Sequence, residues 1–592
     1  MSKLDPIDDL VQKGAAYHHQ GNFDQAEEVY KKILKIEQNN FDALQLLGSL
    51  LAQVEKYLEA LKFLNKALKV KPNDARIQFN KGIVLKELKR FDEALESYDR
   101  AIQIEEGYAD AYNNRGIVLK ELKRLNEALE SYDRAIKIES SYSQAYYNRG
   151  IILQELKRFD EALSHYNKAI AINPNYIDAF NNRGVVLKEL KRFDQALDNY
   201  NQVIALKPDY AKAYYNQGKT FQELNRFNEA LVSYNKAIKI KPDYVEAFNN
   251  LGNSFQEIKK FDSALVNYDY AIELKPDYAD AYFNKSLLLM LLGEYKQGWQ
   301  LYEWRWKQEF KINTIRLYKQ PLWLGNESLT NKTLLIYIEQ GFGDFIQFIR
   351  YIFLVQRLGA KVIIEVPLTL INIIKTLKGK FNIIQSGELL PNFDYHCPVM
   401  SLPLAFKTTI KSIPAKLPYI YVDEKKKILW DKKLGKKEKT RVGLVWSGNP
   451  EHKNDSNRSI LLKKFENIVS LPFEFHCLQK EIQETDIQTI IDFSQIHQHQ
   501  KEIADFSDTA ALIDAMDIII SVDTSVAHLA GAMGKNVWVL LPYLPDFRWM
   551  LDRKDSPWYP SAKLYRQNMK NNWHDVLEGL KIDLLKFIDK RV

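Results

Sequence analysis

The chain has 592 residues, more than one hydrophobic core normally organises, so several domains are expected. Hydrophobic residues make up 46% of it and charged residues 27%, a balance that excludes a largely disordered or fibrous protein. The net charge of +7 comes from lysines mixed with acidic residues at helical spacing, as in residues 86–100. Such mixtures are typical of solvated helix faces, so we expect no nucleic-acid partner.

The two cysteines, Cys397 and Cys477, are too few for a disulfide framework and lack metal-ligand spacing. We therefore expect neither a metal site nor a bound cofactor. The first ten residues carry no apolar signal-peptide run, and no segment reaches the 18 or so apolar residues typical of a membrane span. These observations together predict a cytoplasmic protein without a transmembrane segment.

The first half of the chain repeats itself every 34 residues. A glycine marks each unit: Gly14, Gly48, Gly82, Gly116, Gly150, Gly184, Gly218 and Gly252. Alanine keeps the same step from Ala26 to Ala264, and so does an aromatic ring from Tyr30 to Tyr268, with Leu64 as the exception. We expect the small residues to let the two helices of a unit approach closely and the tyrosine to fill the groove between units. A helix-turn-helix period of this length is the tetratricopeptide (TPR) pattern, so residues 1–278 are predicted to form an α-solenoid of eight repeats.

Residues 279–330 are predicted to be a degenerate capping repeat and a linker. Ser286 takes the place of the glycine and Gly298 that of the alanine, and all ten tryptophans lie at position 299 or later. Terminal repeats of solenoids are commonly atypical, which fits this change of composition.

An asparagine recurs on the first helix of most units. The column is Asn80, Asn114, Asn148, Asn182, Asn216, Asn250 and Asn284. One interpretation is an amide ladder on the concave face, which pairs with the N–H and C=O groups of a bound polypeptide. The other is that asparagine helps the repeats to pack. The sequence leaves both open, and a second copy of the chain is a further partner that the repeats allow.

The pattern changes to alternating strands and helices after residue 331. Short apolar runs at 334–338 and 361–366 suit buried parallel strands. The sequence predicts two Rossmann-like α/β halves, residues 331–430 and 440–592, with the lysine-rich stretch 423–440 as the hinge between them.

Three loops fall where the predicted strands end, which is where such sheets bind ligands. The first holds Gly341, Gly343 and Asp344, with Asp344 as either a general base or a helix N-cap. In the second, Ser447, Asn449 and Lys453 belong to a dense cluster of polar donors that suits phosphate. The third loop opens a helix whose free N–H groups favour a pyrophosphate. Its residues are Asp523, Thr524, Ser525 and His528.

These motifs resemble the heptosyltransferase-like glycosyltransferases, and more closely their TPR-fused bacterial relatives. The resemblance rests on EQGFGDFIQFIRY, GLVWSGNPEHKNDSNRS, the stretch 505–542 and PDFRWMLDRKDSPWYPSAKLYRQ, and it extends back to GWQLYEWRW. The order of domains is also similar to that of O-linked N-acetylglucosamine transferase.

The resemblance implies transfer of a sugar from a nucleotide-diphosphate donor, with inversion and without a metal. It implies that Asp344 is the base, that Asp523, Thr524, Ser525 and His528 form the donor-phosphate turn, and that Lys453 binds phosphate. The expected acceptor is a protein or a glycan-bearing partner held by the repeats. The alternative is a non-catalytic TPR scaffold that carries a relic of the enzyme, because the first α/β half is short and fold likeness alone does not prove activity.

Overall fold

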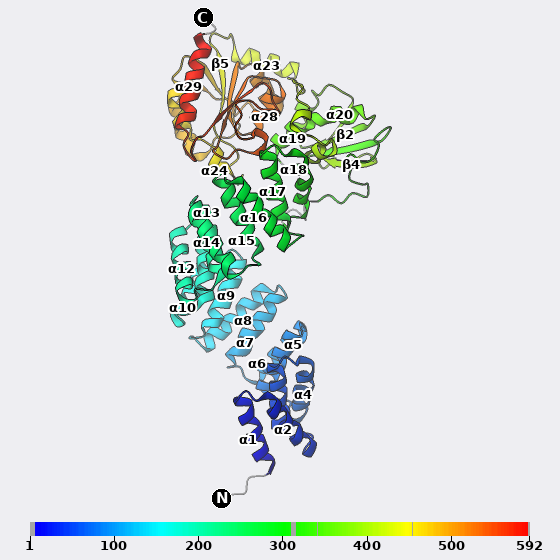
Figure 1. Cartoon of the computed structure of the whole chain (residues 1–592), viewed down its shortest axis with the longest axis vertical. Helices are drawn as coiled ribbons and strands as arrows, with labels where there is room; N and C mark the ends of the chain where they lie inside the picture. The colour runs from blue at the N-terminus through cyan, green and yellow to red at the C-terminus, as the bar shows by residue number, and fades with distance from the viewer. Residues whose placement is uncertain (1–5, 310–314, 340, 453, 590–592) are drawn as a thin grey trace. The chain divides into compact units, whose positions relative to one another are not determined.

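A computed structural model of the chain describes residues 6–309, 315–339, 341–452 and 454–589 (Figure 1). The chain forms two compact units, residues 1–247 and 248–592. The sequence places the end of the repeats at residue 278, so the last full repeat and the capping repeat belong mostly to the second unit. Among the described residues, no helix is both long enough and apolar enough to cross a bilayer.

The repeats fold as consecutive pairs of antiparallel helices of 13 or 14 residues, closed by a shorter last helix. The bounds are α1 Pro6–His19, α2 Phe23–Ile36, α3 Phe41–Gln53, α4 Tyr57–Val70, α5 Ala75–Glu87, α6 Phe91–Ile104, α7 Ala109–Glu121, α8 Leu125–Ile138, α9 Ser143–Glu155, α10 Phe159–Ile172, α11 Ile177–Glu189, α12 Phe193–Leu206, α13 Ala211–Glu223, α14 Phe227–Ile240, α15 Val245–Glu257, α16 Phe261–Leu274, α17 Ala279–Leu291 and α18 Tyr295–Tyr302.

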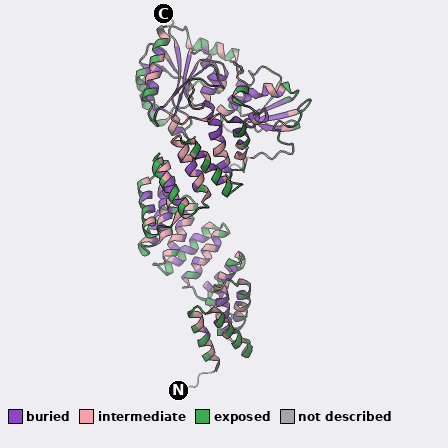
Figure 2. Ribbon diagram, in the orientation of Figure 1, coloured by how far each residue is buried: buried purple, intermediate pink, exposed green. Residues whose placement is uncertain are grey.

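The glycine and tyrosine columns meet within each repeat. A Cβ atom added at Gly116 would lie 2.6 Å from Cε1 of Tyr132, and at Gly82 it would lie 2.5 Å from Cε1 of Tyr98. The tyrosine therefore fills the space between the two helices of its own unit. This corrects the prediction that it fills the groove between units. The buried stripe that results runs through the solenoid (Figure 2).

A second column sets the turn inside each repeat. The second residue after the first helix has positive φ in every described unit: Gly21, Glu55, Lys89, Lys123, Lys157, Lys191, Asn225, Lys259 and Gly293. Only the first and last of these are glycine, the residue that adopts this conformation without strain. In the other repeats a non-glycine residue takes this conformation, and backbone bonds within the turn close it, such as those from Lys89 to Lys86 and from Arg90 to Leu85.

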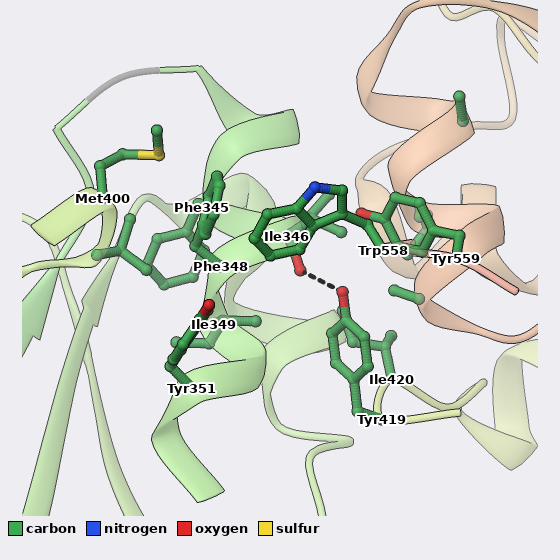
Figure 3. Packing of buried hydrophobic residues seen from close by; sticks show 14 of the residues in the cluster. Phe345, Ile346, Phe348, Ile349, Tyr351, Met400, Tyr419, Ile420, Trp558 and Tyr559 are labelled. Atoms are coloured by element: carbon green, nitrogen blue, oxygen red, sulfur yellow. Dashed lines mark hydrogen bonds between the residues drawn. The ribbon is translucent and has the colours of Figure 1, made fainter. Parts of the chain in front are cut away.

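The last repeats pack into the core of the second unit. Tyr295 and Trp299 of α18 are buried with Phe348 and Trp558 in one continuous cluster. Trp558 also donates from Nε1 to the hydroxyl of Tyr295 at 3.2 Å. Figure 3 shows how Phe348 and Trp558 lie in this cluster, with Tyr419 donating to the carbonyl of Ile346. This packing explains why the chain divides before the repeats end.

The first sheet has four parallel strands in the order β3-β2-β1-β4. The strands are β1 Thr333–Tyr337, β2 Lys361–Val366, β3 Phe381–Gln385 and β4 Tyr395–Pro398. Leu334 and Ile336 share the main core with helices α19 Phe342–Phe348, α20 Ile352–Arg357 and α21 Leu368–Ile374. The opposite face packs against Tyr318, Leu390 and Phe393 from segments without helix. Helices therefore cover one face of this sheet, which differs from a complete doubly wound half.

The second sheet has six parallel strands in the order β10-β9-β8-β5-β6-β7. They are β5 Arg441–Val445, β6 Glu474–Cys477, β7 Ile496–His497, β8 Ile518–Val522, β9 Val537–Leu541 and β10 Ala562–Arg566. Both faces are buried. Helices α27 Phe506–Asp514 and α28 Ser525–Ala532 contribute to the cluster on one face, and α25 Glu466–Val469 and α29 His574–Asp589 to that on the other. Such burial suits parallel strands.

The lysine-rich connector is largely helical, and its predicted role as a hinge stays a prediction. Residues Glu424–Leu434 form α23, whose Trp430 is buried and donates from Nε1 to Asp508 at 3.2 Å. Lys426 donates to the same carboxylate at 2.6 Å. The connector thus packs on α27 through the indole of Trp430. The many lysines around Trp430 gave no indication in the sequence that it is buried.

Candidate functional site

The predicted loops follow strands at which the sheet order changes direction. Strands β5 and β8 are neighbours, yet the chain between them visits β6 and β7 on the other side. In the first sheet, β1 lies between β2 and β4 in the same way. Parallel sheets bind ligands beyond the carboxyl ends of strands at such points, because the loops diverge there and leave a crevice.

Helices α19 and α28 bring the first and third loops together. A Cβ atom added at Gly343 would lie 2.8 Å from Cδ2 of His528 and 3.4 Å from Cα of Ser525. Gly343 therefore allows a close approach of the two helices that no other residue permits. Gly341 is the N-cap of α19, and a Cβ atom there would meet nothing within 4 Å. The two glycines thus have different roles, which the sequence did not separate.

Asp344 lies in the first turn of α19 and forms an ion pair with Arg548 of the segment that follows β9. Its Oδ1 accepts from Nη2 of Arg548 at 2.6 Å, and Arg548 also donates to Asp546 at 2.7 Å. Burial opposes the charge of Arg548, yet the two carboxylates raise its pKa above the usual value. The N-cap is Gly341, so the structure does not show the capping role that the sequence left open for Asp344.

His528 is buried in α28 beside Asp523, the first residue after β8. Nδ1 of His528 bonds the hydroxyl of Tyr559 at 3.0 Å, and Nε2 lies 3.6 Å from Oδ1 of Asp523. Burial and nearby guanidinium groups lower the pKa of His528 well below its usual range, so the ring is neutral. Burial and the charge of Asp546 raise the pKa of Asp523 to about 6.

The turn from β8 to α28 supplies helix N–H groups. Thr524 is the N-cap of α28, and its side chain makes no capping bond to the helix. Its hydroxyl instead bonds that of Ser521 at 3.0 Å. Ser525 follows as the first helical residue, half-buried at the crevice. The first-turn N–H groups therefore stay uncapped by Thr524, and the helix dipole adds positive potential there.

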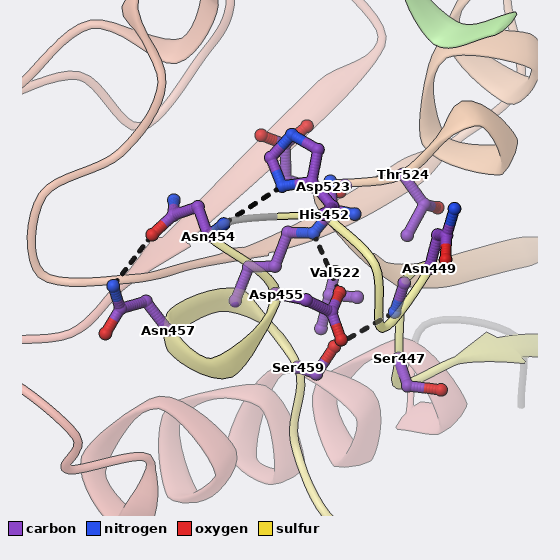
Figure 4. A network of polar contacts seen from close by, with 12 residues as sticks. Ser447, Asn449, His452, Asn454, Asp455, Asn457, Ser459, Val522, Asp523 and Thr524 are labelled. Carbon is purple, nitrogen blue, oxygen red and sulfur yellow. Dashed lines mark hydrogen bonds and ion pairs between the residues drawn. The ribbon is translucent and has the colours of Figure 1, made fainter. Parts of the chain in front are cut away.

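The loop after β5 folds around Arg458, and Figure 4 shows two residues to which Arg458 donates, Asp455 and Asp523. Arg458 donates from Nη1 to the carbonyl of Asp523 at 2.9 Å and from Nε to Asp455 at 3.1 Å. Gly448 permits this arrangement, because a Cβ atom there would lie 2.5 Å from Nη2 of Arg458. Its N–H donates to the hydroxyl of Ser459 at 2.9 Å. The partly buried guanidinium of Arg458 thereby joins the second and third loops.

The other predicted members of this loop differ in role. Ser447 is buried, and both its N–H and its hydroxyl bond the amide of Gln479, at 3.0 and 2.9 Å. This arrangement favours a structural role for Ser447 at the ends of β5 and β6. Asn449 is exposed, and its Oδ1 accepts from the N–H of Glu451 at 3.0 Å. Lys453 lies outside the described residues.

Two buried arginines near the site were missed from the sequence. Arg305, from the capping segment, donates to both oxygens of Glu339 at 3.0 and 2.9 Å and to Glu303 at 2.7 Å. Glu339 follows β1, so the repeats hold the first loop. Arg350 donates to the carbonyl of Trp558 and to the hydroxyl of Tyr419, and so joins the two sheets. The one sequence feature that could have indicated a buried Arg305 is its place among the aromatic residues of the motif GWQLYEWRW.

The asparagine column is largely occupied by contacts within the solenoid. Asn148 donates to Asn113 at 2.9 Å, and Asn216 donates to Asn181 at 2.9 Å. Asn80, Asn182 and Asn284 likewise donate to Ser49, Tyr147 and Asn249 of the preceding repeat, and Asn114 donates to a carbonyl of its own helix. These bonds favour the packing interpretation. Asn250 also engages in polar contacts, and an acceptor role for the column stays a prediction.

Comparisons with known proteins match the repeats. Family models described as tetratricopeptide or TPR repeat match the ranges 17–78, 73–141, 143–176, 165–198, 186–225, 218–259 and 245–278. The N-terminal region is a TPR solenoid. Protein FlbA of Caulobacter vibrioides is 23% identical over 335 residues, which cover 52% of this chain and 55% of that protein. The chain therefore matches little more than half the length of this curated relative.

Solved structures that resemble the chain are also TPR proteins. YrrB, described as a TPR protein with an unusual peptide-binding site, is 27% identical with a TM-score of 0.29 and covers 33% of this chain and all (100%) of its own. A TPR protein of Parabacteroides merdae is 19% identical with a TM-score of 0.35 and covers 42% of this chain and 98% of its own. No group of three or more His, Cys, Asp or Glu residues within the described ranges is arranged to hold a metal.

Proposed function

We propose that the second unit is a glycosyltransferase that moves a sugar from a nucleotide-diphosphate donor to a protein or glycan acceptor. One observation carries the proposal. The crevice at the strand ends brings together an N-terminus of α28 that Thr524 leaves uncapped, the cation Arg458, and the carboxylate of Asp344 from the facing sheet. Two Rossmann-like halves that face each other in this way are what the sequence resemblance implies.

The donor diphosphate binds at the turn from β8 to α28. Uncapped N–H groups and a helix dipole favour an anion at this end of a helix. Arg458, held against the carbonyl of Asp523, adds a fixed positive charge. These groups stabilise the negative charge that develops on the departing nucleoside diphosphate, the role that a metal ion has in other transferases.

Asp344 accepts the proton of the acceptor hydroxyl. The acceptor oxygen forms a bond to the anomeric carbon as the bond from that carbon to the phosphate oxygen breaks, and the nucleoside diphosphate leaves with the electron pair. A single displacement of this kind inverts the anomeric centre. Arg548 positions the carboxylate at 2.6 Å from the side opposite its own α19.

A second candidate is a scaffold without catalysis. It is favoured by the ion pair of Asp344 with Arg548, which occupies one carboxylate oxygen, and by family matches confined to the repeats. In both functions the solenoid presents a polypeptide-binding surface, as TPR arrays commonly do through their concave face. In both, the protein acts in the cytoplasm, and self-association through the repeats is compatible with either.

Nucleotide binding separates the two functions. Ser525 is the first residue of α28, a position that tolerates proline because its N–H is outside the helical bonds. Ser525→Pro therefore removes one phosphate donor and keeps the helix. We expect one of UDP, GDP, ADP or CDP to raise the melting temperature of the wild-type protein and to act at least several-fold more weakly on Ser525→Pro. If none of the four stabilises the wild type, the scaffold is correct.

A further inference from the structure

A cavity of about 250 Å³ lies beside the site, between the last repeats and the second sheet. Leu287 and Leu291 of α17 form one wall, and Tyr543 and Phe547, which follow β9, belong to the other. None of the described residues assigned above to donor binding lines it. The cavity exists only because the repeats pack on the strand ends, so a sheet without the solenoid would not form it.

Each charged group that lines the cavity is already held in an ion pair. Lys570 donates to Glu257 of α15 at 2.6 Å, and Asp546 accepts from Arg548 at 2.7 Å. The remaining polar lining is rich in side-chain amides, from Gln256, Asn454, Asn457, Gln567 and Asn571. A ligand that carries a net charge would find no unmatched partner here, whereas a neutral ligand with several hydroxyl groups would find many.

One of these amides is buried and half-satisfied. Gln567 is 4% exposed, and its Oε1 accepts from the N–H of Tyr543 at 3.1 Å. Its Nε2 has no hydrogen-bond partner among the described residues. A buried donor without an acceptor costs free energy, and in native proteins such groups are nearly always satisfied by protein, water or ligand. Gln567 is one of the lining residues, so an ordered water or a ligand atom in the cavity would supply the missing acceptor.

We infer that this cavity is a subsite for a single neutral pyranose sugar. Carboxamides both donate and accept, so they match the neighbouring hydroxyls of a sugar ring. The rings of Tyr543 and Phe547 and the side chain of Leu287 offer apolar walls for its C–H faces. The volume lies below the roughly 300–1,000 Å³ of pockets that hold drug-sized ligands, which suits one ring.

The subsite is linked to the proposed base, Asp344, through a shared arginine. Asp546 lines the cavity and shares Arg548 with Asp344. Sugar binding in this cavity does not depend on the proposed function. Only the role of that sugar as a substrate rests on it. Two sources share this chemistry, namely the sugar of the nucleotide donor and the terminal sugar of a glycan acceptor.

Saturation-transfer NMR on the full chain tests the subsite directly. The probes are glucose, galactose, mannose and N-acetylglucosamine, each free and at millimolar concentration. We expect saturation to reach the ring protons of at least one sugar. Gln567→Glu keeps the oxygen that holds Tyr543 and replaces the orphaned donor by an acceptor, so we expect about tenfold weaker binding. Leu287→Trp fills the cavity from the repeats, at a half-buried position, and should abolish the signal.

The controls keep the two proposals apart. Gln488→Glu makes the same change at an exposed position of the second sheet domain and should leave the sugar signal unchanged. Ser525→Pro should weaken the nucleotide and spare the free sugar. If the sugar belongs to the donor, the nucleotide sugar will displace the free one; if it belongs to the acceptor, the free sugar and the nucleotide sugar will bind together. No saturation transfer to any of the four sugars, or a signal unchanged in both cavity variants, would overturn the inference.

Discussion

The two units differ in the polar side chains that they bury. In the first unit, the polar side chains buried among the described residues are all uncharged, and the same glycine–tyrosine contact recurs in nearly every repeat. In the second unit, Arg305, Arg350 and Arg548 are buried, and each holds a different set of partners. Repetition is enough to build the solenoid, whereas each buried arginine of the second unit holds its own set of loops in place.

The largest expected effect comes from breaking a buried ion pair in the second unit. Arg305→Met leaves Glu339 and Glu303 uncompensated, which should cost about 3–5 kcal/mol of unfolding free energy. The matched change in the solenoid, Arg115→Met, breaks a half-exposed pair with Asp99 and should cost about 1 kcal/mol or less. Tryptophan fluorescence in denaturant reports the second unit alone, because all ten tryptophans lie there. Circular dichroism follows the solenoid. Equal losses of unfolding free energy in the two variants would contradict the proposed difference between the two units.

A second effect separates the two glycines of the first loop. Gly343→Ala forces α19 away from His528 and should cost roughly 1–3 kcal/mol, with weaker nucleotide binding. Gly341→Ala meets open space and should leave the melting temperature almost unchanged. The measurement is thermal unfolding with and without nucleotide. An undisturbed Gly343→Ala variant would show that the close approach of α19 and α28 is dispensable.

The third effect depends on pH. Because the pKa of Asp523 is raised to about 6, its ionised form destabilises the folded state above that pH, and the penalty disappears below the unfolded value near 4. Asp523→Asn should therefore be more stable than the wild type by on the order of 1–3 kcal/mol at about pH 7.5, and the two should converge near pH 4. Urea unfolding across this range provides the check. A difference that does not vary with pH would contradict the raised pKa.

The smallest effect returns to the solenoid. Lys157 has φ of 59°, so Lys157→Gly should relieve strain and stabilise the first unit by about 0.5 kcal/mol. The control, Lys168→Gly, lies inside α10 and should destabilise it by about 1 kcal/mol. Denaturant titrations followed by circular dichroism measure both changes in unfolding free energy. Changes of opposite sign would confirm that the turn at Lys157 is strained by its left-handed conformation.

The repeats could be predicted well because the same residue types recur every 34 positions and make the same contact in successive units. The sequence also predicted a helix that opens at Thr524 and Ser525, where Thr524 is the N-cap and Ser525 the first helical residue, and it predicted the alternation of strands and helices, since these follow from local pattern. It could not reveal Arg548 or Arg305, whose partners Asp344 and Glu339 lie 204 and 34 residues away. The buried Trp430 was hidden among lysines, and the cavity beside Gln567 depends on how the repeats pack on the sheet.

The most direct test of sugar transfer is the release of nucleoside diphosphate from a panel of nucleotide sugars, with water as the surrogate acceptor. The wild-type protein should release it from at least one donor. Asp344→Asn should release it about 10²–10⁴-fold more slowly, as expected for loss of a general base, while the nucleotide still stabilises the variant against heat. Release at equal rates by the two proteins would remove Asp344 as the base, and no release from any donor by the folded wild type would contradict the account.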